Sequence, residues 1–392
     1  MNRMLTPHQL ELIKSTVPVL QQHGVALTSC MYNRMLRDNP ELRQVFNLGH
    51  QRTGRQQASL AASVLAYAQN IENPSVLSNA VAHIASKHVS LGIRAEHYSV
   101  VGHHLIEAIK EVLGLKDGDE LVEAWAKAYG QLADILIDAE SKLYQTMATT
   151  DGGWSGWRSF KIVEKKQETS DAVSFVLRPV DGGKICTILP GQFISVRVYL
   201  KSEGLVQPRQ YTVVSSDGDS IRICVKRIDP KGDAPAGMVS NALHNDYNVG
   251  DFIDLAPPMG VYHLDTSDTP AVFIIGGIGI TTAVAMLGSA NAEKRNMHLY
   301  FVGHDQKDFA LQQEVNELME SHPNFTLTTR FTADEGRPTA ADFAALARPN
   351  TQYYICGPQG LMKSAINALI EAGVDEALIF NESFGTGVLQ KD

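Results

Sequence analysis

A change in the spacing of apolar residues near position 150 constrains this chain more than any other feature of its sequence. Up to Met147 the apolar positions recur every three and four residues, as expected for amphipathic helices. Beyond Arg158 they alternate in short runs separated by turns, as in half-buried strands. The glycine- and tryptophan-rich segment 151–157 ends the helical pattern and indicates a linker. With 392 residues, the chain is long enough for two or three domains.

The first part of the chain predicts an all-helical domain. Thr6, Pro7 and Gln9 have the arrangement of a capping box, in which the side chains of the first and last bond each other's backbone amides. The last helix is expected from about Asp119 to Thr146, which is long for a globular protein. Its apolar stripe should pack against the other helices of the domain.

The second part predicts two further domains. Six short runs indicate the strands of a small antiparallel β-barrel. They are Phe160–Val163, Ala172–Leu177, Phe193–Val196, Tyr211–Val214, Ile221–Val225 and Phe252–Leu255. From Ala271 on, strands alternate with helices, which predicts an α/β fold with a doubly wound parallel sheet. Its strands are expected at Val272–Ile275, Leu299–Val302, Thr326–Arg330, Tyr353–Ile355 and Leu378–Phe380. We therefore expect domains at 1–150, 151–265 and 266–392.

Composition excludes several classes of partner. Apolar residues make up 44% of the chain and charged residues 20%, as in ordinary globular proteins. The formal charge of -9 opposes binding to nucleic acid or to anionic lipid. No apolar stretch is long enough to span a bilayer, and the N-terminus lacks the apolar core of a secretory signal. The four cysteines lie far apart, as expected for reduced thiols. These features predict a cytoplasmic protein.

Two glycine turns in the last domain point to nucleotide chemistry. The strand Val272–Ile275 runs straight into Gly276-Gly277-Ile278-Gly279, with a helix expected near Thr281. Glycines there let backbone amides approach a phosphate or a flat nicotinamide ring. Thr282 stands where the last glycine of a GxGxxG fingerprint would be, so this turn alone could be any tight strand-to-helix connection. Cys356-Gly357-Pro358 adds a second turn at the same sheet edge, which favours the nucleotide interpretation.

Two patterns in the barrel domain are compatible with a flavin nucleotide. In Arg209-Gln210-Tyr211-Thr212 the arginine and the tyrosine share one strand face, which suits a pyrophosphate beside an isoalloxazine ring. A solvated surface pair is the alternative. Gly237–Asn241 predicts a turn that opens a short helix, with Ser240 and backbone amides free for a phosphate. An ordinary helix cap is the alternative there.

His88 is the candidate metal ligand of the helical domain. It follows Asn73-Pro74 on a helix whose stripe is Leu77, Val81, Ile84, His88 and Leu91. A core histidine bonded to a carbonyl is the alternative. His83 lies about 140° around the same helix. His50, His103 and His104 lie elsewhere, so none of these rivals keeps the stripe.

The motifs RQYT, GMVSN, GGIGIT, CGP and ESFG, in this order, resemble those of the ferredoxin-NADP reductase family. Preceded by a helical domain with a suitable histidine, nearly the whole chain resembles the flavohaemoglobins, which are bacterial and fungal nitric oxide dioxygenases. The resemblance implies a globin domain that binds one haem b, a barrel that binds one FAD, and a sheet that binds NADH or NADPH as electron donor.

The resemblance also implies roles for residues of the globin domain. His88 would be the proximal ligand of haem iron, with Tyr98 and Glu140 bonded to its other nitrogen and giving it imidazolate character. Tyr32 and Gln56 would bond iron-bound dioxygen. Phe46 would pack on the porphyrin and Leu60 would cap the pocket. Lys87 would face the reductase.

In the reductase, the resemblance implies a flavin group and a nicotinamide group of residues. The flavin group is Phe193, Arg209, Gln210, Tyr211, Thr212, Ser240, Glu382 and Phe384. The nicotinamide group is Gly277, Ile278, Gly279, Ile280, Thr281, Thr282, Cys356, Gly357 and Pro358. Three positions depart from the family pattern: Phe193 replaces a common tyrosine, Thr282 a usual proline and Ser383 a common cysteine. Asp305 would repel a 2′-phosphate and Lys307 could attract one, and the balance favours NADH.

The activity implied is an oxidoreductase reaction in which NAD(P)H reduces FAD, FAD reduces haem iron, and haem-bound dioxygen oxidises nitric oxide to nitrate. Nitric oxide and dioxygen would be the substrates, and the chain would act as a monomer. Two alternatives stay open: a haem-based gas sensor or store whose reductase resets the iron, and a flavin reductase for a separate acceptor protein.

Overall fold

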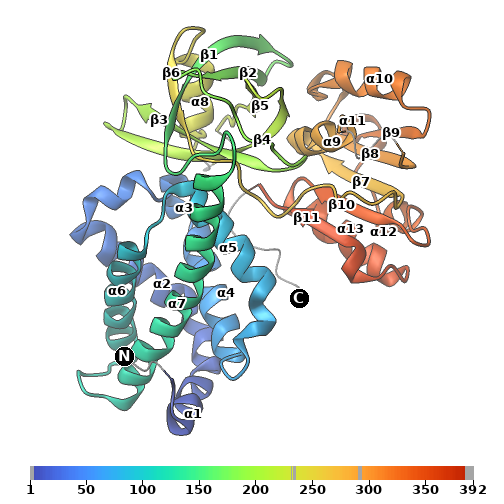
Figure 1. Ribbon diagram of the computed structural model, residues 1–392. Coiled ribbons are helices and arrows are strands. Elements are labelled where there is room, and N and C mark those ends of the chain that lie inside the picture. Colours follow the sequence, from blue (N-terminus) through green and yellow to red (C-terminus); the bar gives the residue numbers. More distant parts are fainter. Residues whose placement is uncertain (1–3, 231, 233–234, 290–293, 385–392) are drawn as a thin grey trace. The chain divides into compact units, whose positions relative to one another are not determined.

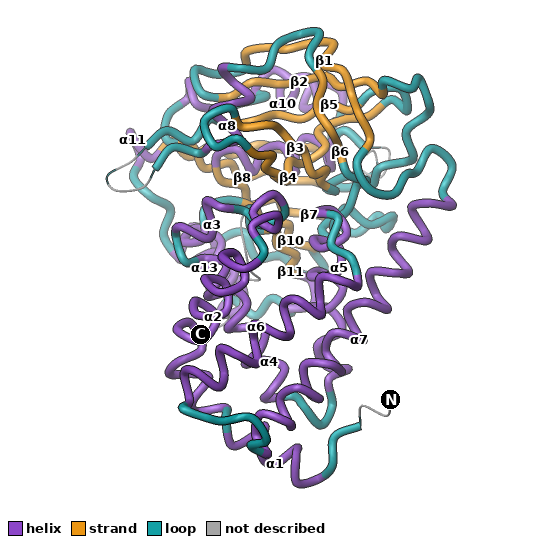
Figure 2. Tube along the Cα trace, turned by 90° about the vertical axis from the view of Figure 1, so that its left-hand side faces the viewer, coloured by secondary structure: helices purple, strands orange, loops and turns teal. Residues whose placement is uncertain are grey.

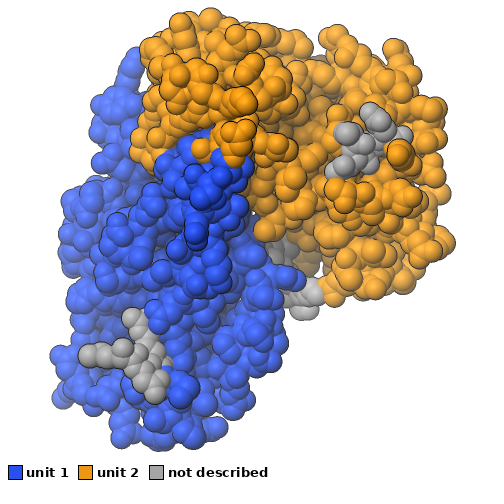
Figure 3. Space-filling model, in the orientation of Figure 1, with its two compact units in different colours: residues 1–150, 154–156, 199–208 blue, residues 151–153, 157–198, 209–392 orange. Residues whose placement is uncertain are grey.

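The computed structural model describes residues 4–230, 232, 235–289 and 294–384. Gly385, the last residue of the ESFG motif, lies outside this set. By its contacts the chain forms two compact units, coloured separately in Figure 3. The first comprises residues 1–150, 154–156 and 199–208, and the second comprises residues 151–153, 157–198 and 209–392. The predicted three-domain boundaries stay a prediction. No helix in the described residues combines the length and apolar character needed to cross a bilayer.

The first unit is built mainly from helices, as predicted (Figures 1 and 2). Its helices are α1 (Pro7–Ser15), α2 (Val17–Asp38), η1 (Pro40–Gln44), α3 (Leu48–Arg52), α4 (Arg55–Gln69), η2 (Pro74–Leu77), α5 (Ser78–Leu91), α6 (Ala95–Leu113) and α7 (Glu120–Thr149). The capping box of Thr6 and Gln9 is present. After Asn73-Pro74 the chain first makes a 3-10 turn, so the α-helix that carries His88 begins later than predicted.

The helices of the first unit enclose an apolar core to which α2, α4, α6 and α7 all contribute. α6 and α7 approach closely at Gly102, where a Cβ atom would lie 2.4 Å from the ring of Tyr129. The long helix α7 spans 30 residues, and Asp119 caps its first turn by accepting a hydrogen bond from the amide of Leu121 at 2.9 Å. Along its length α7 contacts α1, α5 and α6.

The second unit contains the predicted antiparallel barrel, closed in the order β1-β2-β5-β4-β3-β6. Its elements are β1 (Arg158–Gln167), β2 (Ala172–Pro179), β3 (Phe193–Leu200), β4 (Leu205–Ser216), β5 (Ile221–Lys226), α8 (Met238–Asn245) and β6 (Phe252–Leu255). β4 begins at Leu205, well before the predicted run at Tyr211. The sequence pattern hides this first part, because Gln207 and Pro208 interrupt the alternation although both are buried.

The second unit also contains the predicted parallel sheet, in the order β11-β10-β7-β8-β9. Apolar residues on one sheet face pack against α9 and α10, and those on the other face pack against α12 and α13, so the sheet is doubly wound (Figure 1). The elements are β7 (Ala271–Gly276), η3 (Gly277–Gly279), α9 (Ile280–Leu287), β8 (Met297–Gly303), η5 (Gln306–Asp308), α10 (Gln312–Ser321), β9 (Phe325–Phe331), α11 (Thr332–Glu335), α12 (Ala340–Ala344), β10 (Gln352–Cys356), α13 (Gln359–Glu371), η6 (Glu376–Leu378) and β11 (Ile379–Glu382).

The segment that joins the barrel to the sheet is fixed by Arg295, which is fully buried. Its guanidinium donates to the carbonyls of Thr269 and Asp265, to Gln352 Oε1 and to Ser267 Oγ, at 3.0 to 3.1 Å, and forms an ion pair with the Asp265 carboxylate. Burial opposes ionisation of that carboxylate, but hydrogen bonds from Gln352 and Arg295 outweigh it and hold the pKa at about 2.

Replacing Arg295 with methionine is expected to lower the free energy of unfolding of this unit by at least about 2 kcal/mol. The change keeps much of the buried volume but removes the guanidinium that donates to the partly buried carbonyls of Thr269 and Asp265 and pairs with the Asp265 carboxylate. Urea unfolding of the variant, compared with wild type and with Lys307→Met at an exposed ion pair, measures the loss. Equal midpoints for all three proteins would contradict this role of Arg295.

Candidate functional site

The ring of His88 is held through one nitrogen by side chains from two other helices. His88 Nδ1 donates to Glu140 Oε1 at 2.7 Å and lies 3.0 Å from the Tyr98 hydroxyl. Tyr98 donates to the same carboxylate oxygen. Glu140 is 2% exposed, whereas the His88 side chain is 32% exposed. Within the described residues Nε2 makes no hydrogen bond. His88 is therefore bonded to a carboxylate, and not to a carbonyl as in the alternative interpretation.

Neighbouring contacts fix this group of three side chains. Gly92, in the left-handed conformation, ends α5 one residue after Leu91, and Ile93 donates its amide to the His88 carbonyl at 3.0 Å. Tyr144 donates to the Ile93 carbonyl at 2.6 Å. Burial, together with the hydrogen bond and charge of Glu140, raises the pKa of Tyr98, so its hydroxyl stays a donor.

A second polar pair lies on α2 and α4 of the same unit. Tyr32 is buried, and its ring meets that of Phe46 edge to face with centroids 5.7 Å apart. Burial raises the pKa of the Tyr32 hydroxyl by more than the nearby Gln56 amide lowers it. Gln56 Oε1 is buried, with no hydrogen-bond partner among the described residues. Leu60 follows one turn later on α4 and is partly buried against the core.

These residues fit a haem. The fit rests on an imidazole whose second nitrogen is left for a metal, a protonated buried phenol, and an amide oxygen that no described residue pairs. Tyr98 itself belongs to an apolar cluster formed mainly by residues of α5, α6 and α7. Lys87 lies next to His88 on α5 and is half-buried. The individual roles expected for these side chains stay predictions.

The flavin motif lies on β4. Burial lowers the pKa of the Arg209 guanidinium to about 10, with a smaller opposing effect of Tyr211, although both residues are partly exposed. Burial also raises the pKa of the Tyr211 hydroxyl. A poorly solvated guanidinium is stabilised by an anion, so this strand fits a flavin nucleotide with its phosphates. Thr212 is buried and Gln210 partly buried on the same strand.

Two other predicted flavin residues have strong contacts with the protein backbone. Phe193 begins β3 and is buried, and it exchanges two backbone hydrogen bonds of 2.9 Å with Met259. Ser240 on α8 accepts from the Ile228 amide at 3.2 Å and donates to the Gly237 carbonyl at 3.1 Å. The sequence pattern had indicated a free Ser240 hydroxyl, but in the structure this hydroxyl is bonded to the backbone. Its part in phosphate binding stays a prediction.

The two glycine turns lie side by side, because β7 and β10 are neighbouring parallel strands with Ile275 opposite Cys356. A Cβ atom on Gly279 would lie 2.7 Å from the Cys356 carbonyl oxygen, so the backbones touch where only glycine fits. Thr282 is fully buried and donates to the Gly279 carbonyl at 2.8 Å. Thr282, which the resemblance expects to replace a proline, therefore stabilises the turn through this hydrogen bond. Thr281 donates to the Ile278 carbonyl at 3.0 Å, and Ile280 is buried. The two turns also contain Gly277, Gly357 and Pro358.

Cys356 and Glu382 are opposite each other on β10 and β11, and both are buried. Burial and, to a smaller extent, the charge of Glu382 raise the pKa of the Cys356 thiol, so it stays protonated. Phe384 is 46% exposed, near the end of the described chain. Asp305 and Lys307 form one exposed ion pair of 2.8 Å after β8, and the preference for NADH stays a prediction.

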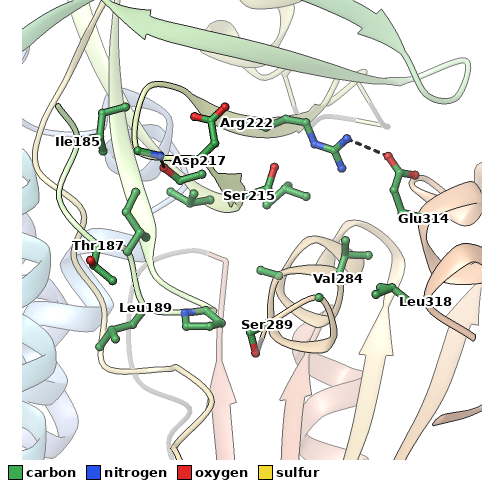
Figure 4. Close-up of a pocket in the computed structure, with 18 of the residues that line it drawn as sticks. Ile185, Thr187, Leu189, Ser215, Asp217, Arg222, Val284, Ser289, Glu314 and Leu318 are labelled. Carbon is green, nitrogen blue, oxygen red and sulfur yellow. Dashed lines mark hydrogen bonds and ion pairs between the residues drawn. The ribbon is translucent and has the colours of Figure 1, made fainter. Parts of the chain in front are cut away.

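A cavity of about 800 Å³ lies elsewhere in the second unit (Figure 4). Its walls include the segment 185–190, the end of β4, and residues of α9 and α10. Arg222 and Glu314, which form an ion pair of 2.9 Å, are among the residues that line it. None of the residues predicted to bind a cofactor lines it. It adjoins the later parts of β4 and α9, beyond the residues of the flavin and nicotinamide motifs.

Comparison with known proteins identifies the family. Residues 29–136 match the globin family, residues 159–264 the oxidoreductase FAD-binding domain, and residues 273–366 the oxidoreductase NAD-binding domain. The flavohaemoprotein of Bordetella pertussis is 46% identical, covering 98% of this chain and 99% of that protein. The flavohaemoprotein of Chromobacterium violaceum is 44% identical over the same shares of the two chains. The chain belongs to the flavohaemoproteins.

Solved structures agree with this membership. The crystal structure of a flavohaemoglobin from Malassezia yamatoensis, with bound FAD and haem, superposes with a TM-score of 0.87 and 30% identity, covering 97% of this chain and all 100% of that one. The FAD/NAD-binding domain of a nitric oxide dioxygenase from Vibrio cholerae is 32% identical, with a TM-score of 0.54, and covers 58% of this chain and 98% of that one. This flavohaemoprotein is thus an NAD(P)H-dependent oxidoreductase with haem and FAD as cofactors.

Replacing Arg209 with alanine in this flavohaemoprotein is expected to weaken FAD binding about tenfold, because a charge-assisted hydrogen bond to a phosphate is lost. Arg209→Lys should recover only part of the affinity, since an ammonium cannot form the paired bonds of a guanidinium. Flavin fluorescence during titration of the apoprotein measures both affinities. An unchanged dissociation constant for the alanine variant would remove Arg209 from the flavin site.

Proposed function

We propose that this flavohaemoprotein is a nitric oxide dioxygenase, which uses NADH or NADPH to convert nitric oxide and dioxygen to nitrate. When bound, FAD accepts a hydride and passes on single electrons, and haem iron binds dioxygen. The observation that carries the proposal is the bonding of His88 to the buried Glu140 and Tyr98.

The proposed role of Glu140 is to hold the proton of His88 Nδ1 and to increase the basicity of Nε2. The carboxylate lies 2.7 Å from Nδ1 in a buried site, where its charge is weakly screened. The Tyr98 hydroxyl, kept protonated by its raised pKa, orients the same carboxylate oxygen. An electron-rich ligand of this kind favours activation of dioxygen over simple storage.

The proposed role of Tyr32 and Gln56 is to stabilise negative charge on the substrate side of the haem. Tyr32 stays protonated because burial raises its pKa, so it can donate a hydrogen bond. Fixed donors in a buried pocket stabilise developing charge without reorganising. Phe46 and Leu60 would exclude water and larger molecules from the pocket.

The proposed role of the second unit is to deliver electrons. Arg209, Tyr211 and Thr212 would hold FAD, and the paired turns at Gly277–Thr282 and Cys356–Pro358 would hold the nicotinamide nucleotide at the carboxyl edge of the sheet. The buried Glu382 and the protonated thiol of Cys356 would lie beside the hydride path.

Nitrate production tests the proposal. The protein is mixed with NADH, dioxygen and nitric oxide, and nitrate is measured together with the loss of nitric oxide. We expect one nitrate for each nitric oxide consumed, over many turnovers. Consumption of nitric oxide without matching nitrate would exclude the dioxygenase. A sensor or store would instead show normal haem reduction with slow turnover, and a reductase for a separate acceptor would lack the intense haem absorption band.

A further inference from the structure

The turn between β3 and β4 makes contacts that do not involve the residues of the flavin and nicotinamide motifs. Residues 199–208, here called the 199–208 hairpin, comprise the end of β3, the turn and the start of β4. By their contacts they belong to the helical first unit, although the strands continue into the barrel. At its tip, the amides of Glu203 and Gly204 donate to the Leu200 carbonyl at 3.2 and 2.9 Å, so the turn is closed by its own backbone.

Gln207 connects the hairpin to the helical part of the first unit, and its side chain is fully buried. Its Nε2 donates to the carbonyls of Arg43 and Phe46 at 2.7 and 3.2 Å. Its Oε1 accepts from the amide of Leu48 at 3.1 Å. One side chain thus pairs three backbone groups of the segment 43–48.

The segment 43–48 needs such partners, because it joins the end of η1 to the start of α3 and includes residues outside regular secondary structure. An amide side chain offers two N–H donors and an acceptor oxygen, which suits the carbonyls of Arg43 and Phe46 and the amide of Leu48. Nε2 also lies 3.2 Å from the carbonyl of the neighbouring Val206. The partly exposed ion pair Arg52–Glu203, at 3.2 Å, adds a weaker contact between α3 and the hairpin.

Phe46 is in the middle of this segment, and its ring lies against that of Tyr32. We propose that Gln207 is a positioning residue of the haem pocket: from the 199–208 hairpin it holds the segment 43–48, and with it the Phe46 ring. The pocket then depends on a residue outside the stretch 29–136 that matches the globin family. This inference rests on the proposed haem site, and goes beyond it by assigning a role to a residue of the reductase part of the sequence.

The test uses full-length holoprotein with Gln207→Ala and Gln207→Glu. The glutamate variant keeps the volume and one acceptor oxygen but loses both donors and brings a carboxylate against two carbonyls. Haem release to an excess of an apoglobin acceptor should become about tenfold faster in each variant, since the partly buried carbonyls of Arg43 and Phe46 lose their donor and the segment 43–48 is held less firmly. The circular dichroism of the haem band should change as well, because it reports the contacts of the haem with aromatic rings.

A control variant and three further measurements keep the result interpretable. Lys201→Ala, an exposed position in the same hairpin, should release haem at the wild-type rate. FAD content and NADH-driven reduction of ferricyanide should be unchanged in the Gln207 variants, which shows that β4, with Arg209 two residues further on, is intact. Faster hydrogen exchange of the Leu48 amide in Gln207→Ala, which removes the acceptor oxygen, shows that the bond was present and has been lost.

Wild-type haem release and an unchanged haem band in both Gln207 variants, together with faster exchange at Leu48 in Gln207→Ala, would overturn the inference. The outcome is separable from that of the haem site itself. If His88→Ala keeps its haem, the proposed site is wrong. If His88→Ala loses haem while the Gln207 variants release it normally, only the role of Gln207 is wrong.

Discussion

Replacing His88 with alanine is expected to give a protein that keeps FAD but binds haem more than about 100-fold more weakly, since loss of a ligand costs more than loss of its supporting partner. Alanine removes Nε2 and leaves the Glu140 carboxylate and the Tyr98 hydroxyl bonded to each other. Nitric oxide consumption should fall with the haem content. The haem-to-protein and FAD-to-protein ratios of the purified variant measure the effect.

His103→Ala is the matched control, since His103 is an exposed histidine on α6 of the same unit. It should purify with normal haem. NADH-driven reduction of ferricyanide should be normal in both variants, because this reaction needs only flavin and nicotinamide. A His88→Ala protein with full haem content and a normal absorption spectrum would show that another residue ligates the iron.

Changing Glu140 to glutamine is expected to keep the haem but to lower nitric oxide turnover by about 10–100-fold. The amide oxygen can still accept hydrogen bonds from His88 and Tyr98, so the geometry is largely preserved. What is lost is a buried negative charge 2.7 Å from His88 Nδ1. A less electron-rich histidine stabilises oxidised iron less well, so the reduction potential of the haem should become more positive.

Redox titration and steady-state nitric oxide consumption test this prediction together. Tyr98→Phe is the comparison, because it removes the second donor to Glu140 but leaves the charge. We expect a smaller shift of the potential in Tyr98→Phe than in Glu140→Gln. If Glu140→Gln had the wild-type potential and turnover, the carboxylate would be only a structural partner of the histidine.

The periodicity of the sequence predicted much of the fold because each domain has a strong local pattern. The capping box at Thr6, the long last helix, the closed barrel and the doubly wound sheet were all predicted and are confirmed by the structure. Local signals mark the ends of elements less sharply. The helix carrying His88 starts at Ser78 after a 3-10 turn, and β4 starts before its apolar alternation does.

The candidate site was less accessible to sequence reasoning, because its contacts join residues far apart in the chain. Tyr129 and Tyr144 donate hydrogen bonds to the backbone carbonyls of Tyr98 and Ile93, close to the histidine. In the sequence they are connected with the site only by lying on the same long helix as Glu140. Gln207 gave no signal, since a glutamine in a strand is usually solvated. Its importance comes from three backbone groups that no pattern could place next to it.

The most direct test of the central claim is the origin of the oxygen atoms in nitrate. The protein, supplied with NADH, turns over unlabelled nitric oxide in the presence of isotopically labelled dioxygen, and the nitrate is analysed by mass spectrometry. A dioxygenase places both labelled atoms of each dioxygen molecule in the same nitrate ion, and this is the result that we predict. Nitrate that carries a single labelled atom or none would contradict the proposed function.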